Sequence, residues 1–224
     1  MEQIEVRNTS KSYRIGENVI RAVDGVSLKV KRGEFVSIKG HSGSGKTTLL
    51  SMIGGILKNS EGEILYNGTD IYRLRHDELS QYRAKKVGFI FQFASLLPVL
   101  TARENLQLPT IFSRNGSTPK VNMAEEYLDM VGLKDKMDAY PSQLSGGQQR
   151  RVAIARSLMN DPEVILGDEP TGDLDEETEM EIIDLLKRVN RQQSTTVILV
   201  THNSELARTA SKQFEMSQGS LKEI

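Results

Sequence analysis

The segment Phe35–Thr47, with the sequence FVSIKGHSGSGKT, decides the fold of this chain. Phe35–Ile38 is a short apolar strand, and Thr47–Ile53 has the pattern of a helix. Between them, residues 40–47 fit G-x-x-x-x-G-K-[ST] at every fixed position. Glycines let successive backbone N–H groups face phosphate oxygens, and the helix start adds its positive dipole end. The alternative is a glycine-rich turn without a ligand, which the flanking strand and helix disfavour.

A second apolar strand, Val164–Leu166, leads into the carboxylates Asp168 and Glu169. In parallel α/β sheets ligands lie beyond the carboxyl ends of the strands, so these side chains are predicted beside the phosphates. There Lys46 would reach the β- and γ-phosphates, while the Thr47 hydroxyl and Asp168 would hold Mg²⁺. Glu169 suits a base, or an orienting group, for the attacking water. A solvated acidic strand end is the alternative, and the accompanying phosphate loop disfavours it.

The remaining pattern predicts an α/β core with a helical insertion. Glu176–Asn190 reads as an amphipathic helix, and Thr196–Val200 as another buried strand. Short apolar runs that alternate with helices indicate parallel strands covered on both faces. The first third of the chain reads as strands, and Asn67-Gly68 predicts a hairpin with a type I′ turn. The stretch from about Phe93 to Leu158 is predicted to be mainly helical.

Composition excludes several classes of function. Lys and Arg number 29 against 30 Asp and Glu, which gives no electrostatic case for binding nucleic acid. Without cysteine there is no disulfide, thiolate metal site or cysteine nucleophile. The charged N-terminus does not match a signal peptide, and apolar windows such as Val197–Val200 are too short to span a bilayer. We therefore expect a soluble chain, to which another subunit would supply any membrane part.

Leu144–Gln148, with the sequence LSGGQ, predicts a second anion site. It combines a hydroxyl with two glycines whose amide groups open a helix. A chain with one nucleotide pocket has little use for two such sites, so we predict that two chains pair. Each chain would then offer this segment to the γ-phosphate bound by the other. The alternative is that Ser145 only caps the helix, which explains the serine but not the two glycines.

From Ile4 to its C-terminus the sequence resembles the ABC ATPase family, whose signature is LSGGQ. The resemblance implies that Tyr13 stacks on adenine, and that Gln92 senses Mg²⁺ and water. It also implies that Gly172–Asp175 is the D-loop, which crosses a dimer interface, and that His202 contacts the γ-phosphate. Ordinary packing of the tyrosine and a structural role for the histidine are the alternatives. The predicted strand before His202 should lie beside the strand that carries Glu169.

The resemblance implies a P-loop NTPase core with a mostly parallel sheet, an N-terminal antiparallel β subdomain and an inserted helical subdomain. The predicted bounds are residues 1–224 for the single domain and 93–158 for the insertion. The predicted catalytic residues are Glu169, His202 and Gln92. The predicted Mg²⁺ site consists of Thr47, Gln92 and Asp168. The predicted ATP-binding residues are Tyr13, Gly40, His41, Ser42, Gly43, Ser44, Gly45, Lys46, Thr47, Thr48, Gln92, Ser145, Gly146, Gly147, Gln148 and Asp168.

Two positions depart from the family pattern. His41 stands where proline is often found, with a side chain expected to point away from phosphate, and Gly167 stands where alanine is usual. Neither is a catalytic group, so we expect an active ATPase.

Within the family, the chain resembles the group that powers lipoprotein release, macrolide export and antimicrobial-peptide resistance (LolD/MacB-like). Gly33–Ile38, Ser51–Gly55, Val87–Gln92 and Leu96–Leu106 carry this resemblance. It implies an ATP-sandwich homodimer at the cytoplasmic face of the membrane, driving an integral permease. The apolar stretch Phe93–Leu100 is predicted to line the groove for the permease's coupling helix, with core between two lobes as the alternative.

Three other functions are weighed against this one. A cell-division ABC ATPase that regulates a wall hydrolase through a related permease stays open. An ABC ATPase acting on DNA or ribosomes would carry coiled-coil insertions or two cassettes, and neither is seen. A P-loop kinase or GTPase would lack LSGGQ, and the guanine-recognition motif Asn-Lys-x-Asp is missing here.

Overall fold

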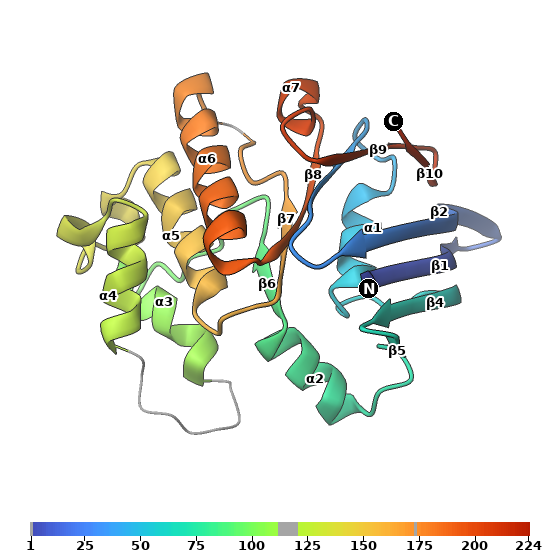
Figure 1. Ribbon diagram of the computed structural model, residues 1–224, viewed down its shortest axis with the longest axis horizontal. Helices are drawn as coiled ribbons and strands as arrows, with labels where there is room; N and C mark the ends of the chain where they lie inside the picture. The colour runs from blue at the N-terminus through green and yellow to red at the C-terminus, as the bar shows by residue number, and fades with distance from the viewer. Residues whose placement is uncertain (1, 112–120, 173) are drawn as a thin grey trace.

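The computed structural model describes residues 2–111, 121–172 and 174–224. Two β-sheets meet near the middle of the molecule, and helices gather mainly on the side away from the antiparallel sheet (Figure 1). Asp173 of the predicted D-loop lies outside the described residues, as do residues 112–120 of the predicted insertion. Within the described ranges, no helix combines the length and the apolar character that crossing a membrane requires.

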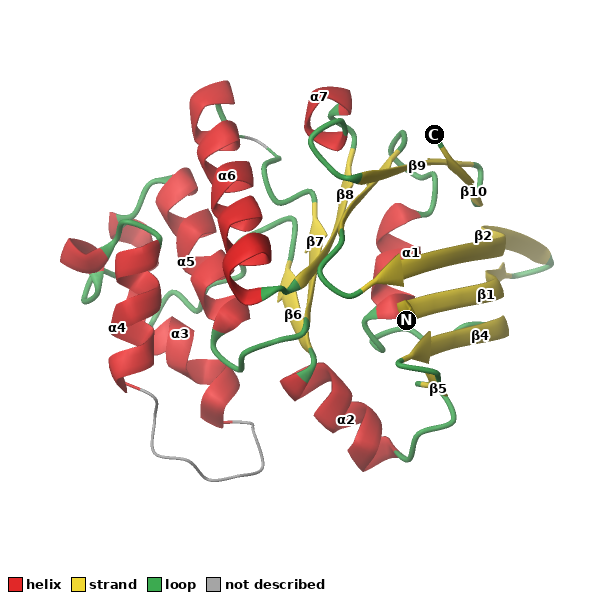
Figure 2. Cartoon of the chain, in the orientation of Figure 1, coloured by secondary structure: helices red, strands yellow, loops and turns green. Residues whose placement is uncertain are grey.

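Strands and helices follow one another along the whole described chain (Figure 2). The elements are β1 Glu2–Ile15, β2 Asn18–Lys31, β3 Phe35–Lys39, α1 Lys46–Ile53, β4 Glu61–Tyr66, β5 Thr69–Asp70, α2 His76–Lys85, β6 Val87–Ile90, α3 Ala102–Ile111, α4 Val121–Met130, α5 Gly146–Leu158, β7 Val164–Asp168, α6 Glu176–Gln193, β8 Thr196–Thr201, α7 Ser204–Ala207, β9 Lys212–Ser217 and β10 Ser220–Glu223, with 3₁₀ turns at Lys134–Lys136 and Pro141–Gln143.

The central sheet has six strands in the order β10-β9-β3-β8-β7-β6. All neighbouring pairs are parallel except β9 with β10, which are antiparallel. Successive side chains of a strand point to opposite faces, so its buried strands feed two cores. In β7, Val164 and Leu166 pack with α1 and the antiparallel sheet, whereas Ile165 packs with α3–α6. This two-sided burial explains why the strand reads as a continuous apolar run.

The N-terminal sheet is antiparallel, with its four strands in the order β2-β1-β4-β5. Its predicted hairpin is confirmed, because Asn67 (φ 48°) and Gly68 (φ 82°) both have the left-handed backbone that a type I′ turn requires. Helices α3, α4 and α5 pack on one another on the far side of the central sheet. The predicted fold class is therefore confirmed, while the exact bounds 1–224 and 93–158 remain predictions.

Helix α2 and the final strand pair β9–β10 were not predicted from the sequence. Helix α2 begins at His76, whose side chain is exposed, as the sequence indicated. Strand β9 lies beside β3, so Met216 comes next to the glycine loop that follows β3.

Candidate functional site

The predicted phosphate loop, residues 40–47, connects β3 to α1 and is tightly enclosed by other strands. A Cβ at Gly45 would lie 2.1 Å from the Ala22 carbonyl oxygen, and the φ of Gly45 is 106°. A Cβ at Gly40 would lie 2.3 Å from the Met216 carbonyl oxygen. Both glycines are therefore required by close approach of backbone, and Gly45 by its left-handed conformation as well.

This loop offers unsatisfied donors to an anion. Helix α1 begins at Lys46, and its N-cap residue Gly45 supplies no side-chain cap, so the first amide N–H groups of the helix lack a partner within the helix. The Ser44 hydroxyl is buried and has no hydrogen-bond partner in the described part of the chain. Because buried polar groups are normally paired, these donors fit a phosphate ligand.

A cleft of about 600 Å³ opens over the loop. Its lining residues are Ala22, His41, Ser42, Gly43, Ser44, Gly45, Lys46, Thr47, Thr48, Gln92, Glu169 and His202. The structure therefore brings together most of the predicted nucleotide-binding residues with all three predicted catalytic ones. Ala22, from β2, was missed, and an isolated alanine gives no sequence signal for such a position.

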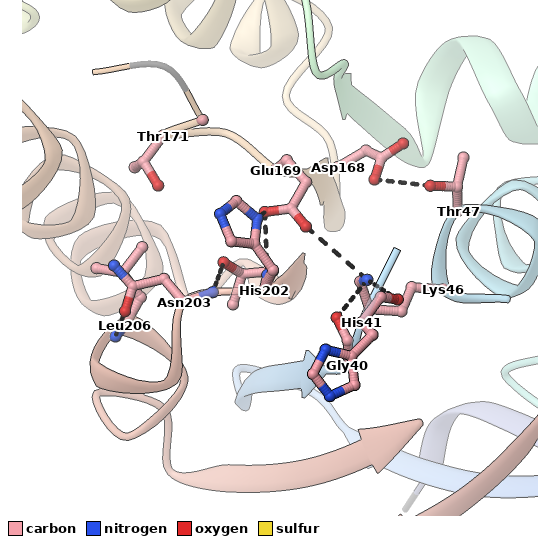
Figure 3. A network of polar contacts seen from close by, with 12 residues as sticks. Gly40, His41, Lys46, Thr47, Asp168, Glu169, Thr171, His202, Asn203 and Leu206 are labelled. Atoms are coloured by element: carbon pink, nitrogen blue, oxygen red, sulfur yellow. Dashed lines mark hydrogen bonds and ion pairs between the residues drawn. The ribbon is translucent and has the colours of Figure 1, made fainter. Parts of the chain in front are cut away.

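Glu169 lies at the centre of the polar network in the cleft (Figure 3). Its Oε2 is 3.0 Å from His202 Nδ1 and also accepts from the His202 backbone N–H at 3.2 Å. Its Oε1 is 3.9 Å from Lys46 Nζ, and this ammonium donates to the carbonyl oxygens of Gly40 and His41. The Glu169 side chain is 13% exposed and that of Lys46 is 7% exposed. The carboxylate is thus held between a cation and an imidazole, with little solvent around it.

The backbone of Glu169 is also fixed in an uncommon conformation. Its φ of 45° lies in the left-handed region that a non-glycine residue seldom adopts. Its N–H donates to the Val200 carbonyl at 3.0 Å, and its own carbonyl accepts from the Gly172 N–H at 3.0 Å. Such strain, which costs on the order of 1–3 kcal/mol, persists where the surroundings fix it, often at functional sites. The predicted pairing of β7 with β8, which brings Glu169 to His202, is confirmed.

Asp168 and Thr47 face each other next to this network. The Thr47 hydroxyl donates to Asp168 Oδ1 at 3.0 Å. Oxygen ligands of this kind suit Mg²⁺, which is usually bound through one or two carboxylates together with substrate phosphates. The described residues contain no group of three or more His, Cys, Asp or Glu side chains that could hold a metal alone. Thr47 and Asp168 therefore fit a Mg²⁺ ion that a nucleotide brings with it.

Asp168→Asn is expected to stabilise the nucleotide-free chain and to abolish hydrolysis. Burial raises the pKa of Asp168 most strongly, with Glu169 adding to the rise, and the Thr47 and Lys46 contacts oppose it. A raised folded-state pKa means that the ionised carboxylate opposes folding at pH 7. This penalty disappears as pH falls through that pKa. Asparagine keeps the acceptor for Thr47 without the charge.

The test is thermal unfolding with EDTA at pH 7 and at lower pH. The variant should have the higher midpoint at pH 7, by about 2–4 °C for each ~1 kcal/mol gained, and the advantage should shrink on acidification. A midpoint below that of the parent chain at pH 7 would contradict the assignment of the buried charge.

The segment Leu144–Gln148 lies outside this cleft. Ser145 caps α5, because its Oγ accepts from the Gln148 N–H at 3.2 Å while Gln148 Oε1 accepts from the Ser145 N–H at 2.9 Å. This is the capping geometry that the sequence left as an alternative. A Cβ on Gly147 would meet Thr178 Cγ2 at 2.6 Å, whereas one on Gly146 would meet nothing within 4 Å. The opening of α5 is thus an exposed, well-formed helix start that does not line the cleft over the phosphate loop of its own chain.

Tyr13 is not part of the cleft lining either. It lies on β1 with 38% of its surface exposed, and Lys11 Nζ is 5.4 Å from its ring centroid. Its role toward adenine remains a prediction. His41 is exposed and borders the cleft, and the further prediction that its side chain points away from phosphate also stays open.

Arg150 was not predicted from the sequence as a site residue. It is buried, and it donates to the Phe91 carbonyl at 2.8 Å and to the Gly172 carbonyl at 3.3 Å. These contacts join α5 to the segments before Gln92 and after Glu169.

A family model described as ABC transporter matches residues 23–172 of the chain. The chain belongs to the ABC transporter family. It is 44% identical over 220 residues to an uncharacterised ABC transporter ATP-binding protein of Methanocaldococcus jannaschii, with 96% of this chain and 94% of that protein covered. A dimeric structure of that cassette, described as a post-hydrolysis state bound to ADP and Pi, matches with a TM-score of 0.91 and 42% identity, covering 99% of this chain and 97% of that one.

Two further relatives of this ABC ATPase are named for particular systems. It is 41% identical over 218 residues to the lipoprotein-releasing system ATP-binding protein LolD of Syntrophus aciditrophicus, covering 97% of this chain and 98% of that protein. It is 43% identical over 216 residues to the macrolide export ATP-binding/permease protein MacB of Bdellovibrio bacteriovorus. That alignment covers 96% of this chain but 33% of the relative, so the chain spans about a third of MacB. The expected ABC ATPase family and enzyme class are therefore confirmed.

Proposed function

We propose that this cassette binds two ATP molecules between two copies of itself and drives a LolD/MacB-type membrane permease from the cytoplasmic face. One observation carries the dimer: the cleft and the opening of α5 are separate sites on the same chain, each suited to phosphate. Pairing lets the signature segment (Leu144–Gln148) of one copy complete the cleft of the other. The dimeric structure of the M. jannaschii relative supports this arrangement.

In each site the phosphate loop would bind and orient the triphosphate. The α1 amide groups and Lys46 would bind the β- and γ-phosphates. The Thr47 hydroxyl, Asp168 and Gln92 would hold Mg²⁺, which supplies charge neutralisation to the phosphate oxygens when bound. Ser145 and Gly147 of the partner copy would close over the γ-phosphate.

Glu169 would act as base, or orienting group, for the attacking water. Its carboxylate is positioned by His202 on one oxygen and lies near Lys46 on the other. As the oxygen of the water attacks the γ-phosphorus, a proton of the water would pass to the carboxylate. ADP would leave with the electron pair of the broken P–O bond. Loss of the γ-phosphate then removes the charge that both copies bind, so the dimer opens.

The segment that follows Gln92 is proposed to receive the permease. Phe93 and Val99 are 70% and 77% exposed, which does not match the alternative of buried core. Arg156 donates to the carbonyl oxygens of Ala94 and Ser95, so the backbone is held while apolar side chains face solvent. Exposed apolar surface next to a catalytic cleft is typical of a protein-binding site.

The test is a membrane pull-down with tagged Glu169→Gln chain and ATP, followed by mass spectrometry. We expect recovery of a permease with few membrane helices and a large external domain. The matched control is the same chain with Phe93→Ser and Val99→Ser, which should recover much less of it. Recovery of ribosomal or DNA-associated proteins alone would contradict the transporter function, and a permease that acts on a wall hydrolase would assign the cell-division role instead.

A further inference from the structure

Behind the Glu169–His202 pair, three side chains form a connected hydrogen-bond bridge. Glu179, in the first turn of α6, accepts from the Thr171 hydroxyl at 2.8 Å through Oε1. The same carboxylate accepts from Asn203 Nδ2, at 3.2 Å on Oε1 and 3.1 Å on Oε2. Thr171 is buried, and Glu179 is partly buried. One carboxylate therefore joins two loops that belong to different strands.

We propose that Glu179 is a positioning residue that fixes Glu169 and His202 against each other. Thr171 comes two residues after Glu169, and Asn203 comes directly after His202. Figure 3 places Thr171 and Asn203 on the side of the pair that faces away from Lys46. The bridge thus spans the two chain segments whose separation determines the 3.0 Å contact between His202 Nδ1 and Glu169 Oε2.

Asn203 is suited to this bridge because both the oxygen and the nitrogen of its side-chain amide form hydrogen bonds. Its Oδ1 caps α7 by accepting from the N–H groups of Glu205 and Leu206, at 2.9 and 3.3 Å. Its Nδ2 is the donor to Glu179. An aspartate would keep the cap but lose the donor, and it would place a second carboxylate about 3 Å from the first, where like charges repel. The bridge therefore requires an amide at position 203. Asn203→Asp breaks the bridge with almost no change in side-chain size.

The inference rests on the proposed roles of Glu169 and His202. It is tested by exchanging the amide at position 203 with the carboxylate at position 179. Asn203→Asp should lower kcat for ATP hydrolysis roughly 10- to 100-fold, by analogy with the loss of a hydrogen-bond partner that orients a metal ligand. Its KM for ATP, and its equilibrium binding of a fluorescent ATP analogue, should change less than about twofold, because the phosphate loop is untouched.

The double variant Asn203→Asp with Glu179→Gln should recover kcat. In it the glutamine amide donates to the new aspartate, while its Oε1 still accepts from Thr171. Glu177→Gln, the same charge change at an exposed position on α6, serves as the control and should keep the parent rate. Thermal unfolding of every variant separates lost positioning from lost folding.

The proposal is overturned if Asn203→Asp keeps the parent kcat, or if its loss persists in a folded double variant. It is also overturned if KM rises as much as kcat falls. These outcomes are independent of the membrane pull-down, because hydrolysis is measured on the isolated cassette without a permease. A chain that hydrolyses ATP but recovers no permease would contradict the proposed transport role and leave this inference standing.

Discussion

Glu169→Gln is expected to bind ATP normally and to lose nearly all hydrolysis. The change replaces one carboxylate oxygen by an NH2 group of similar size, in a side chain that is only 13% exposed. The left-handed backbone and its bonds to Val200 and Gly172 do not involve the side chain, so the fold should be kept. The amide cannot accept the water's proton, and a missing general base costs roughly 100- to 10,000-fold in kcat.

Steady-state phosphate release and equilibrium ATP binding are the two measurements. With ATP retained, the variant should also accumulate as a dimer, which light scattering at increasing ATP concentration detects. Glu205→Gln, an exposed carboxylate on α7, is the control and should hydrolyse ATP at the parent rate. Hydrolysis by Glu169→Gln within a few-fold of the parent chain would show that another group activates the water.

The parts of this fold that local sequence determines were predicted well. The phosphate loop is local, since a strand, a glycine-rich turn and a helix start follow one another within residues 35–53. The same holds for the β4–β5 hairpin, where Asn67 and Gly68 supply the two left-handed residues themselves. Strands β7 and β8 were predicted because burial on both faces requires continuous apolar runs.

Features that depend on distant partners were not predictable in the same way. Ala22 reaches the cleft because β2 runs past Gly45, a relation set by tertiary packing. Apolar and polar residues alternate only weakly in strands β9 and β10. These strands are positioned by the pairing of β9 with β3 and of β10 with β9. The Glu179–Asn203 bridge joins residues 24 apart in sequence, and each alone reads as an ordinary polar residue of a helix or loop. Arg150 likewise reads as a surface cation until its burial and its two carbonyl partners are seen.

Gly146→Asp is expected to leave the single chain intact and to abolish hydrolysis. A Cβ at this position has nothing within 4 Å, so the substitution fits. Gly146 is the first residue of α5, where a carboxylate is favourable to the helix dipole. Ser145 would still cap the helix through Gln148. Thermal unfolding should therefore be unchanged or slightly improved, and ATP binding to the dilute chain should be normal because the segment lies outside the cleft.

The loss would arise only when two chains meet. A carboxylate that faces the partner's γ-phosphate at about 4 Å is repelled by about 4 kcal/mol at an effective dielectric constant near 20, so kcat should fall at least ~100-fold. Gly146→Ala adds the same Cβ without the charge and should lose less. Phosphate release, unfolding and ATP-dependent dimerisation in the Glu169→Gln background separate the two interpretations of the signature segment. If Ser145 and its neighbours only cap α5, Gly146→Asp will hydrolyse ATP at the parent rate. If they bind the partner's nucleotide, this stable variant will neither dimerise with ATP nor turn it over.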